Sequence, residues 1–288
     1  MSITSTPPAS VPIAALIQMT SGIDPAANLA TIDRAMADAA AGGAVMAFLP
    51  EMSLLLDRDR ARSAEHIVRE ADSAWPTALQ EMAQKEGIWL HSGSMPLLSD
   101  DGERRVNRSH VIAPDGSIRA RYDKIHMFDV TLPTGENWTE SAAYAGGDTL
   151  VVVDTPLGRL GLSICYDLRF PELYRALVDR GATLIAIPAA FTVPTGEAHW
   201  HMLMRARAIE TGCHVLAAAQ CGDHDDGRAT YGHSLIVDPW GGVLADAGAA
   251  CNGTGYRVVL APIDGAATER ARQAIPLNRS RAMRNISL

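Results

Sequence analysis

The hydrophobic positions of the first fifty residues predict a strand, a helix and a second strand. Residues 13–19 form an apolar run of strand length, and an alanine-rich stretch then opens at Asp24-Pro25 and closes at Gly42, as helices commonly do. Residues 44–49 form another apolar run, which predicts a second buried strand. A strand, a helix and a strand in this order predict two parallel neighbours in one sheet.

Later segments mix such helical crossovers with tight turns. The turn sequence at residues 113–116 separates two alternating stretches and predicts an antiparallel hairpin that ends at Lys124. Crossovers give parallel neighbours and tight turns give antiparallel ones, so the mixture suggests two packed sheets with helices outside. The remaining expected helices are residues 64–86, with a break or restart at Pro76, 172–180 and 197–211, and the remaining expected strands are residues 88–95, 150–153, 160–164, 183–187, 215–219, 234–237, 243–246 and 256–260.

No internal repeat or linker divides the chain, so we expect one domain over residues 1–288. Residues 1–10 are rich in Ser, Thr and Pro and are expected to fray, and residues 265–288 are expected to be a C-terminal helix and tail. Residues 125–147 are rich in Gly, Pro, Asn and Trp. An irregular segment of this length predicts a functional loop.

Composition narrows the classes of function. The formal net charge is -8 and 47% of the residues are hydrophobic. An acidic chain of this kind does not favour nucleic acid or an anionic membrane surface as a partner. No apolar run approaches membrane-spanning length, and no basic residue precedes Arg34, where a secretory signal would carry charge. We therefore expect a soluble protein of the cytoplasm.

Cys165 stands out among the cysteines. It ends an apolar strand, and a helix starts soon after it at Pro171. The positive end of that helix dipole would favour a thiolate at this position, although a small buried core residue is the alternative. Uneven spacing in a long chain predicts reduced thiols rather than a disulfide framework. The four residues concerned are Cys165, Cys213, Cys221 and Cys251.

Two further polar residues stand where strands end. Glu51 follows the strand at residues 44–49, and Lys124 ends the hairpin. Cleavage of an amide by a thiol needs a base, a cation or N–H donors for the oxyanion, and a proton donor for the leaving amine. Glu51 can serve as base and then acid, and Lys124 with the Tyr166 backbone N–H can hold the oxyanion. Each residue taken alone also has a commoner structural interpretation.

The chain resembles the nitrilase superfamily of carbon–nitrogen hydrolases from its first strand to about Pro262. The resemblance implies that Cys165 is the nucleophile, Glu51 the general base and Lys124 the oxyanion stabiliser. It also implies that Glu140 is a second carboxylate, which positions substrate or lysine. The family fold is a four-layer αββα sandwich, commonly paired into dimers, and no cofactor or metal is needed. The motifs include Leu-Pro-Glu51-Met, Tyr-Asp-Lys124-Ile-His-Met-Phe-Asp, Trp-Thr-Glu140-Ser, Ile-Cys165-Tyr-Asp-Leu-Arg-Phe-Pro-Glu and Tyr231-Gly-His-Ser.

The residues after the nucleophile indicate a branch of the family. Nitrilases proper usually have Trp-Glu there, whereas this chain has Tyr166-Asp167, as amidases do. The segment resembles the Nit-type amidases, which implies a small carboxylated amide as substrate, such as deaminated glutathione or the omega-amide of a 2-oxo acid. A general aliphatic amide and an N-carbamoyl amino acid remain alternatives, and an amine could replace water as the acyl acceptor.

Several residues are expected to bind the substrate. Arg169 can pair with a substrate carboxylate, or it can tie its turn to Glu172 instead. The loop after the strand at residues 183–187 should line the pocket and set the accepted chain length. The expected substrate-binding residues are Tyr166, Arg169, Ala190, Phe191, Thr192 and Thr195.

Two segments depart from the family pattern. Asp123 stands where relatives usually have Arg or Lys, so it places a negative charge beside Lys124. The loop at residues 133–138 also differs from the Nit-type amidases.

A metal-dependent hydrolase and a catalytically silent relative are rival interpretations. The histidines and cysteines lack the spacing of a recognised zinc site, so no metal site is predicted. His126 and His233 are interpreted as structural groups. The candidate ligands considered are His199, His201, Cys213, His214, Cys221 and His224.

Overall fold

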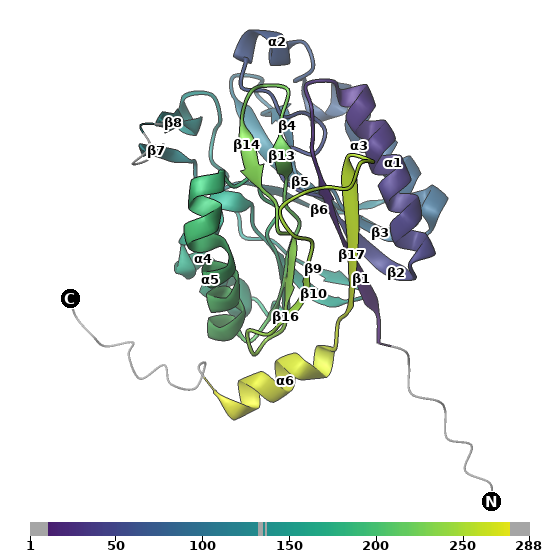
Figure 1. Ribbon diagram of the computed structural model, residues 1–288, viewed down its shortest axis with the longest axis vertical. Helices are drawn as coiled ribbons and strands as arrows, with labels where there is room; N and C mark the ends of the chain where they lie inside the picture. The colour runs from purple at the N-terminus through teal and green to yellow at the C-terminus, as the bar shows by residue number, and fades with distance from the viewer. Residues whose placement is uncertain (1–10, 132–134, 136, 277–288) are drawn as a thin grey trace, which may run out of the picture.

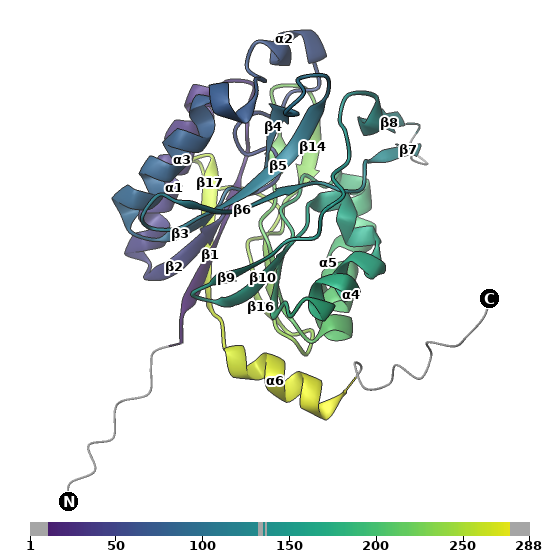
Figure 2. The same ribbon diagram turned by 180° about the vertical axis from the view of Figure 1, so that it is seen from behind.

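The computed structural model describes residues 11–131, 135 and 137–276. Two β-sheets lie face to face in the middle of the molecule, and helices cover the outer face of each sheet (Figures 1 and 2). The layers run helix, sheet, sheet, helix, which is the expected four-layer αββα sandwich. The expected frayed end at residues 1–10 and the tail from residue 277 onward lie outside the described residues.

The first sheet contains strands from near both ends of the described chain. Its strand order is β17-β1-β2-β3-β5-β4, with β6 paired to β5, and β1 runs parallel to β2 and antiparallel to β17. Helices α1 (Pro25–Ala41) and α3 (Ala74–Glu86) pack on its outer face. The strands are β1 (Ile13–Met19), β2 (Ala44–Phe48), β3 (Trp89–His91), β4 (Met95–Leu98), β5 (Arg105–Ile112), β6 (Ile118–Asp123) and β17 (Tyr256–Pro262).

The second sheet has the order β16-β15-β12-β11-β10-β9. Helices α4 (Pro171–Asp179) and α5 (Val193–Thr211) pack on its outer face. Its strands are β9 (Val152–Thr155), β10 (Gly158–Leu162), β11 (Leu184–Ala186), β12 (His214–Ala217), β15 (Leu235–Val237) and β16 (Val243–Asp246). The remaining elements are β7 (Asp129–Thr131), β8 (Asn137–Thr139), β13 (Cys221–Asp223), β14 (Ala229–Tyr231), α2 (Arg60–Ala64), α6 (Gly265–Ala274) and the 3-10 turns η1 (Glu70–Asp72), η2 (Glu140–Ala142) and η3 (Cys165–Arg169).

Alternating side chains of the strands fill three apolar layers. In β1, Leu16 points into the layer between the two sheets, whereas Ile17 points toward α1 and α3. Both side chains are completely buried. The period of two is the reason, because successive side chains of a strand point to opposite faces. A continuous apolar run such as residues 13–19 is therefore what a strand covered on both faces requires.

The predicted helix at residues 64–86 is wrong in its first half. The chain forms the short α2 and η1 instead, and α3 begins at Ala74 after Ser73, whose side chain accepts from the Trp75 N–H. Pro76 lies in the first turn of α3, where its missing N–H leaves no partner unsatisfied. Pro76 therefore marks the restart that was one of the two expected outcomes.

The single strand predicted at residues 88–95 is also wrong, because it is two strands separated by a turn at Gly93. Gly93 has a φ of 64°, and a Cβ there would clash with the carbonyl oxygen of Pro50. The turn brings β4 beside β5 and presses against the segment that carries Glu51. The interruption therefore supports the loop at the end of β2.

The cysteine prediction needs a correction as well. Cys221 and Cys251 form a disulfide, whereas Cys165 and Cys213 are free. The two bonded residues are 30 positions apart, and only the fold brings β13 beside the loop that precedes β17. Among the described residues, no helix is both long enough and apolar enough to cross a bilayer.

Candidate active site

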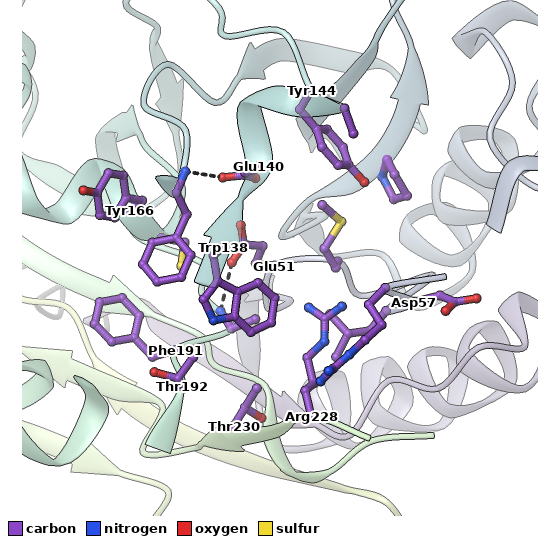
Figure 3. A pocket seen from close by; sticks show the side chains of 18 of the residues that line it. Glu51, Asp57, Trp138, Glu140, Tyr144, Tyr166, Phe191, Thr192, Arg228 and Thr230 are labelled. Carbon is purple, nitrogen blue, oxygen red and sulfur yellow. Dashed lines mark hydrogen bonds between the residues drawn. The ribbon is translucent and has the colours of Figure 1, made fainter. Parts of the chain in front are cut away.

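Four of the sequence-predicted residues meet at one end of the sandwich. Glu51 follows β2, Lys124 follows β6, Cys165 opens η3 after β10, and Glu140 opens η2. All four line one cavity of about 820 Å³ (Figure 3). The two sheets contribute to it jointly, because Glu51 and Lys124 come from the first sheet and Cys165 comes from the second.

Lys124 lies between two carboxylates. Its Nζ is 3.1 Å from Oε1 of Glu51 and 2.8 Å from Oε2 of Glu140, and its side chain is almost completely buried. Burial alone would lower the pKa of Lys124, but the charges of Glu140 and Glu51 raise that pKa well above its usual value. The lysine is therefore a permanent cation, and it can stabilise negative charge in the cavity.

Glu51 is held by partners that fix both of its oxygens. Asn107 Nδ2 donates to Oε1 at 2.9 Å, and the backbone N–H of Ala190 donates to Oε2 at 3.0 Å. Gln220 Nε2 donates to the backbone carbonyl of Glu51 at 3.0 Å. Asn107 and Gln220 were not predicted from the sequence, because an amide in a strand and an amide after a strand carry no pattern of their own.

Cys165 has a left-handed backbone conformation with a φ of 49°. This conformation is uncommon for a residue with a side chain and is often found at functional sites. The backbone N–H of Cys165 donates to the Pro188 carbonyl at 2.9 Å, which ties the turn to the end of β11. The thiol thus has a fixed position at the junction of β10 and η3.

The expectation that a helix dipole favours a thiolate is wrong. Burial, the Glu51 charge and a hydrogen bond with that carboxylate raise the pKa of the Cys165 thiol well above its usual value, although the Lys124 cation opposes this. The helix α4 begins at Pro171, six residues later, and the 3-10 turn η3 stands between it and Cys165 in the chain. The resting group is a neutral thiol that needs a base.

Asp167 locks the turn that carries Cys165. Its side chain is completely buried and accepts from Tyr122 Oη at 2.7 Å, the Ile164 N–H at 2.9 Å and the His126 N–H at 3.0 Å. His126 Nδ1 lies 2.7 Å from the same carboxylate. His126 is thus a structural group, and Asp167 joins the Cys165 turn to the segment that follows Lys124. From the sequence, Asp167 was interpreted only as a residue that distinguishes amidases from nitrilases, and this structural role was not predicted.

Glu140 is positioned by the irregular segment after β6. The Phe128 N–H donates to Glu140 Oε2 at 2.6 Å, and Glu140 in turn contacts Lys124. The segment contains β7, β8 and η2, and it forms part of the cavity wall. Residues 133, 134 and 136 of the divergent loop lie outside the described residues, as does residue 132 before it.

Asp123 does not leave a negative charge free beside Lys124. Its carboxylate receives two hydrogen bonds from Arg108, at 2.7 Å from Nε and 2.9 Å from Nη2. Arg108 also lies 2.9 Å from Glu70. The hydrogen bonds with Asp123 raise the pKa of Arg108 above its usual value. The negative charge that Asp123 adds is therefore compensated by the Arg108 cation of β5.

The mouth of the cavity is rich in arginine. The Trp138 ring lies near two of these cations, 5.8 Å from the Arg58 guanidinium and 5.5 Å from that of Arg228. Figure 3 shows Trp138 and Arg228 in the cavity. Such stacking fixes the ring and the cations together. The arginines that line the cavity are Arg58, Arg60, Arg105, Arg169 and Arg228. Apart from Arg169, these arginines were not predicted from the sequence, because they come from segments that are far apart in the chain.

Arg169 stacks on aromatic rings rather than on an acid. Its guanidinium lies 5.9 Å from the Tyr166 ring and 5.4 Å from the Phe191 ring, and its Nη1 is 3.3 Å from His199 Nδ1. The described contacts of Arg169 are these two rings and His199, and the alternative pairing with Glu172 is not among them.

The other expected substrate-binding residues also line the cavity. Ala190 uses its N–H to hold Glu51, and Phe191 is buried against Trp200. The loop is shorter than predicted, because α5 begins at Val193 rather than at residue 197. Pro194 fits the first turn of the helix, and Thr195 lies there with its Oγ1 2.9 Å from Thr192 Oγ1.

The candidate metal ligands named from the sequence do not form one site. Cys221 is in the disulfide, Cys213 is buried near Arg272, and His224 lies between Ser21 and Thr230. His199 contacts Arg169. The described residues therefore place no metal ligand set of that list in the cavity.

Known proteins are similar to this chain in sequence and in fold. The family model for carbon-nitrogen hydrolases matches residues 13–273. A deaminated glutathione amidase from Yersinia enterocolitica is 43% identical over 232 residues, which are 80% of each chain.

Solved structures agree. The NitFhit protein of C. elegans superposes with a TM-score of 0.84 and 37% identity over 94% of this chain and 65% of its own. Saccharomyces cerevisiae Nit3, a member of branch 10 of the nitrilase superfamily, has a TM-score of 0.81 and 31% identity over 94% of this chain and 96% of its own. The chain belongs to the carbon-nitrogen hydrolase family, whose members cleave carbon–nitrogen bonds other than peptide bonds.

Proposed function

We propose that the protein is a thiol amidase that hydrolyses a small carboxylated amide of the deaminated glutathione class. The observation that carries this proposal is the cluster of Cys165 with the buried Glu51 and Lys124 inside a cavity whose mouth is lined by arginines. The name of the relative from Yersinia enterocolitica points to the same substrate. A cavity of about 820 Å³ also suits a substrate of this size.

In the proposed first half-reaction, Glu51 takes the proton of Cys165 as the sulfur attacks the amide carbon. The carbonyl oxygen becomes negative, and the Lys124 ammonium with the Tyr166 N–H stabilises it. The carbon–nitrogen bond then breaks, and Glu51 gives its proton to the leaving ammonia or amine. An acyl group joined to Cys165 through a thioester remains.

In the second half-reaction, Glu51 accepts a proton from water while the water oxygen attacks the thioester. The same cation holds the second oxyanion. The carbon–sulfur bond breaks, the sulfur recovers a proton from Glu51, and a carboxylic acid is released. Glu140 keeps Lys124 in place throughout, because its two oxygens lie 3.0 Å and 2.8 Å from the lysine Nζ.

Substrate carboxylates are proposed to bind the arginines of the mouth. Deaminated glutathione carries carboxylates at its ends, and guanidinium groups bind carboxylates through paired hydrogen bonds. Arg169 is suited to this role because its described contacts are rings and one histidine nitrogen, which leave the cation uncompensated. Tyr166, Phe191, Thr192 and Thr195 would form the wall beside it.

A substrate panel tests the proposal. Product release is measured with deaminated glutathione, alpha-ketoglutaramate, succinamate, a carbamoyl amino acid and a simple aliphatic amide, for the wild type and Cys165→Ala. Preference for a carboxylated amide, lost in Cys165→Ala and weakened in Arg169→Met through a higher KM, supports the assignment. Turnover of only the simple amide would move the protein to the general aliphatic amidases.

We also propose that the protein forms a homodimer through α5. Met202 and Ile209 lie seven residues apart on one face of this helix and are 73% and 48% exposed. Trp240 is 62% exposed and lines a second hollow together with Ile209. Exposed apolar groups gathered in this way favour association. Sedimentation analysis of the wild type and of Met202→Glu tests this, and a wild-type monomer at micromolar concentration would refute it.

The cytoplasm remains the proposed compartment, and the free thiols of Cys165 and Cys213 are compatible with it. The Cys221–Cys251 disulfide instead favours a compartment that is less reducing than the cytoplasm. Cell fractionation with thiol trapping distinguishes these two compartments. Protein in the cytoplasmic fraction with Cys221 and Cys251 reduced would support the cytoplasm.

A further inference from the structure

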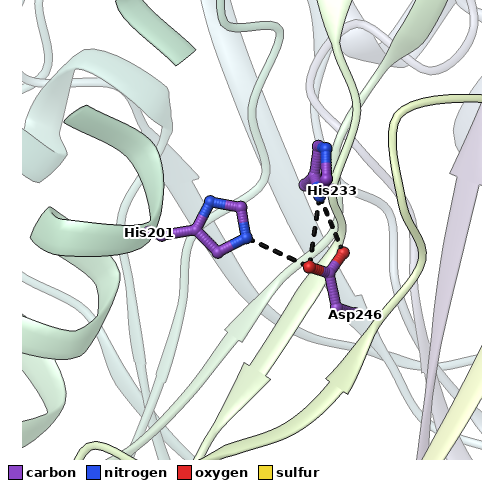
Figure 4. Close-up of side chains that lie close together, drawn as sticks. All are labelled: His201, His233 and Asp246. Atoms are coloured by element: carbon purple, nitrogen blue, oxygen red, sulfur yellow. Dashed lines mark hydrogen bonds and ion pairs between the residues drawn. The ribbon is translucent and has the colours of Figure 1, made fainter. Parts of the chain in front are cut away.

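Two histidines and an aspartate form a cluster outside the catalytic cavity. His201 comes from α5, His233 from the turn after β14, and Asp246 from the end of β16 (Figure 4). Each offers one nitrogen or oxygen atom, and these atoms lie within 4.8 Å of one another. The catalytic account above uses none of the three residues.

The carboxylate of Asp246 lies between the two rings. His201 Nε2 is 3.0 Å from Asp246 Oδ2, and His233 Nδ1 is 3.0 Å from Oδ1 and 3.1 Å from Oδ2 (Figure 4). Ligand atoms around a tetrahedral metal ion, each about 2 Å from the ion, are separated by similar distances. An ion can therefore enter the cluster with only small side-chain movements.

The surrounding structure holds the cluster in place. His233 has a φ of 55°, its N–H donates to the Gly248 carbonyl at 2.8 Å, and its ring stacks on Tyr231 at 4.5 Å. Asp246 Oδ1 also accepts from the Gly248 N–H at 2.8 Å. Two of the three ligands are thus oriented before any ion arrives, which lowers the entropy lost on binding.

In the single chain, the side chains of the cluster are partly exposed. The side chains of His201, His233 and Asp246 are 37%, 22% and 31% exposed. An ion could reach them without passing through the catalytic cavity, and a water molecule could complete its coordination. Imidazole nitrogens select zinc and its neighbours among the transition metals over magnesium and calcium, which prefer oxygen ligands.

We propose that His201, His233 and Asp246 bind one divalent transition-metal ion of the zinc type. The ion takes no part in the reaction and joins α5 to the hairpin of β15 and β16. The site lies close to the cavity wall, since Tyr231 packs against Gly196 in the first turns of α5 so tightly that a Cβ there would clash. Bound metal therefore stiffens the helix that carries Thr195.

The proposal is tested with Zn²⁺ binding to the Cys165→Ala protein, in which the active-site thiol cannot compete for the ion. Calorimetry and competition with a chromogenic chelator should give one equivalent of bound Zn²⁺. His201→Gln and Asp246→Asn should each weaken that binding by at least about tenfold. Asp246→Asn keeps the Oδ1 acceptor for Gly248, so it removes the charged ligand and leaves the turn intact.

His66→Gln is the matched control. His66 Nε2 lies 3.4 Å from Glu65 at another part of the surface, so it offers a histidine and a carboxylate without the third ligand. Zn²⁺ should raise the melting temperature of the Cys165→Ala and His66→Gln proteins, and leave that of His201→Gln unchanged. Absence of stoichiometric binding, or binding of equal strength after His201→Gln and Asp246→Asn, would overturn the proposal.

Discussion

The Nζ atom of Lys124 lies 3.1 Å from Oε1 of Glu51, and both side chains are almost completely buried. Glu140 lies on the other side of the same cation at 2.8 Å. One cation between two carboxylates leaves this cluster with a negative formal charge. That charge disfavours a further negative group, so the Cys165 thiol stays protonated at rest. Moving a proton from Cys165 to Glu51 does not change that net charge. This relationship supports the proposal that Glu51 is the base.

Replacing Lys124 should abolish most of the activity. Lys124→Ala removes the proposed oxyanion donor, so kcat should fall about a hundredfold or more. Lys85→Ala is the matched control, because Lys85 is an exposed surface lysine paired with Asp33 and Glu86, and it should keep wild-type rates. Steady-state amide hydrolysis measures both variants. A loss of less than tenfold for Lys124→Ala would assign that lysine another role.

Asp167→Asn should destabilise the protein as well as slow it. All the described groups around this carboxylate can donate, so an amide NH₂ in its place would face donors. We expect a loss of about 2 kcal/mol or more in the free energy of unfolding. Tyr122→Phe removes one donor only and should cost about 1 kcal/mol. Urea denaturation measures both, and equal effects would contradict the described network.

Acid should destabilise the protein through His91. Burial, with the charge of His110, lowers the pKa of His91 to about 3, and the ring nitrogens contact Gly93 and Ser109. The folded state thus keeps the ring neutral while the unfolded state binds a proton below pH 6.5. The stabilisation is full above pH 6.5 and is lost as the pH falls toward 3.

The loss attributable to His91 between pH 7 and pH 5 should be about 2 kcal/mol. His91→Asn should remove that part of the pH dependence, whereas His66→Gln, at an exposed surface histidine, should leave it unchanged. Denaturant unfolding at the two pH values gives the comparison. Identical pH dependence in His91→Asn and the wild type would show that His91 is protonated equally in both states.

Reducing the Cys221–Cys251 disulfide should lower stability without touching the nucleophile. The bond closes a segment with a sequence separation of 30, and the loss of that constraint costs about 3–4 kcal/mol in the chain-entropy model. Cys251→Ser should show the same loss, and Cys213→Ser serves as a control at a free buried thiol. Equal melting temperatures of the oxidised and reduced wild type would argue that the bond adds no stability.

Much of the fold could be predicted from local pattern. The strand at residues 13–19 and the helix between Asp24 and Gly42 match β1 and α1, because period and capping residues act over a few positions. The start of α5 could not be placed, because Pro194 is compatible with either a loop or a first helical turn.

The residues of the site likewise fall into those that could be predicted from the sequence and those that could not. Glu51, Lys124 and Cys165 could be named because they stand at strand ends and lie in family motifs. Asn107, Asp167 and Gln220 could not, since each acts on a residue that is far away in the chain. The disulfide was missed for the same physical reason, because sequence spacing does not report the contact between β13 and the loop before β17.

Trapping the acyl group tests whether the reaction passes through a thioester on Cys165. Glu51→Gln keeps the size of the side chain but cannot accept the proton of the Cys165 thiol, so this variant should not form the acyl group. When the wild type is quenched during turnover of deaminated glutathione, peptide mass spectrometry should find the acyl mass on the Cys165 peptide, whereas Glu51→Gln treated in the same way should show none. Hydroxylamine should remove the acyl group, as expected for a thioester. Turnover by Cys165→Ala, or an acyl group on another residue, would contradict the account.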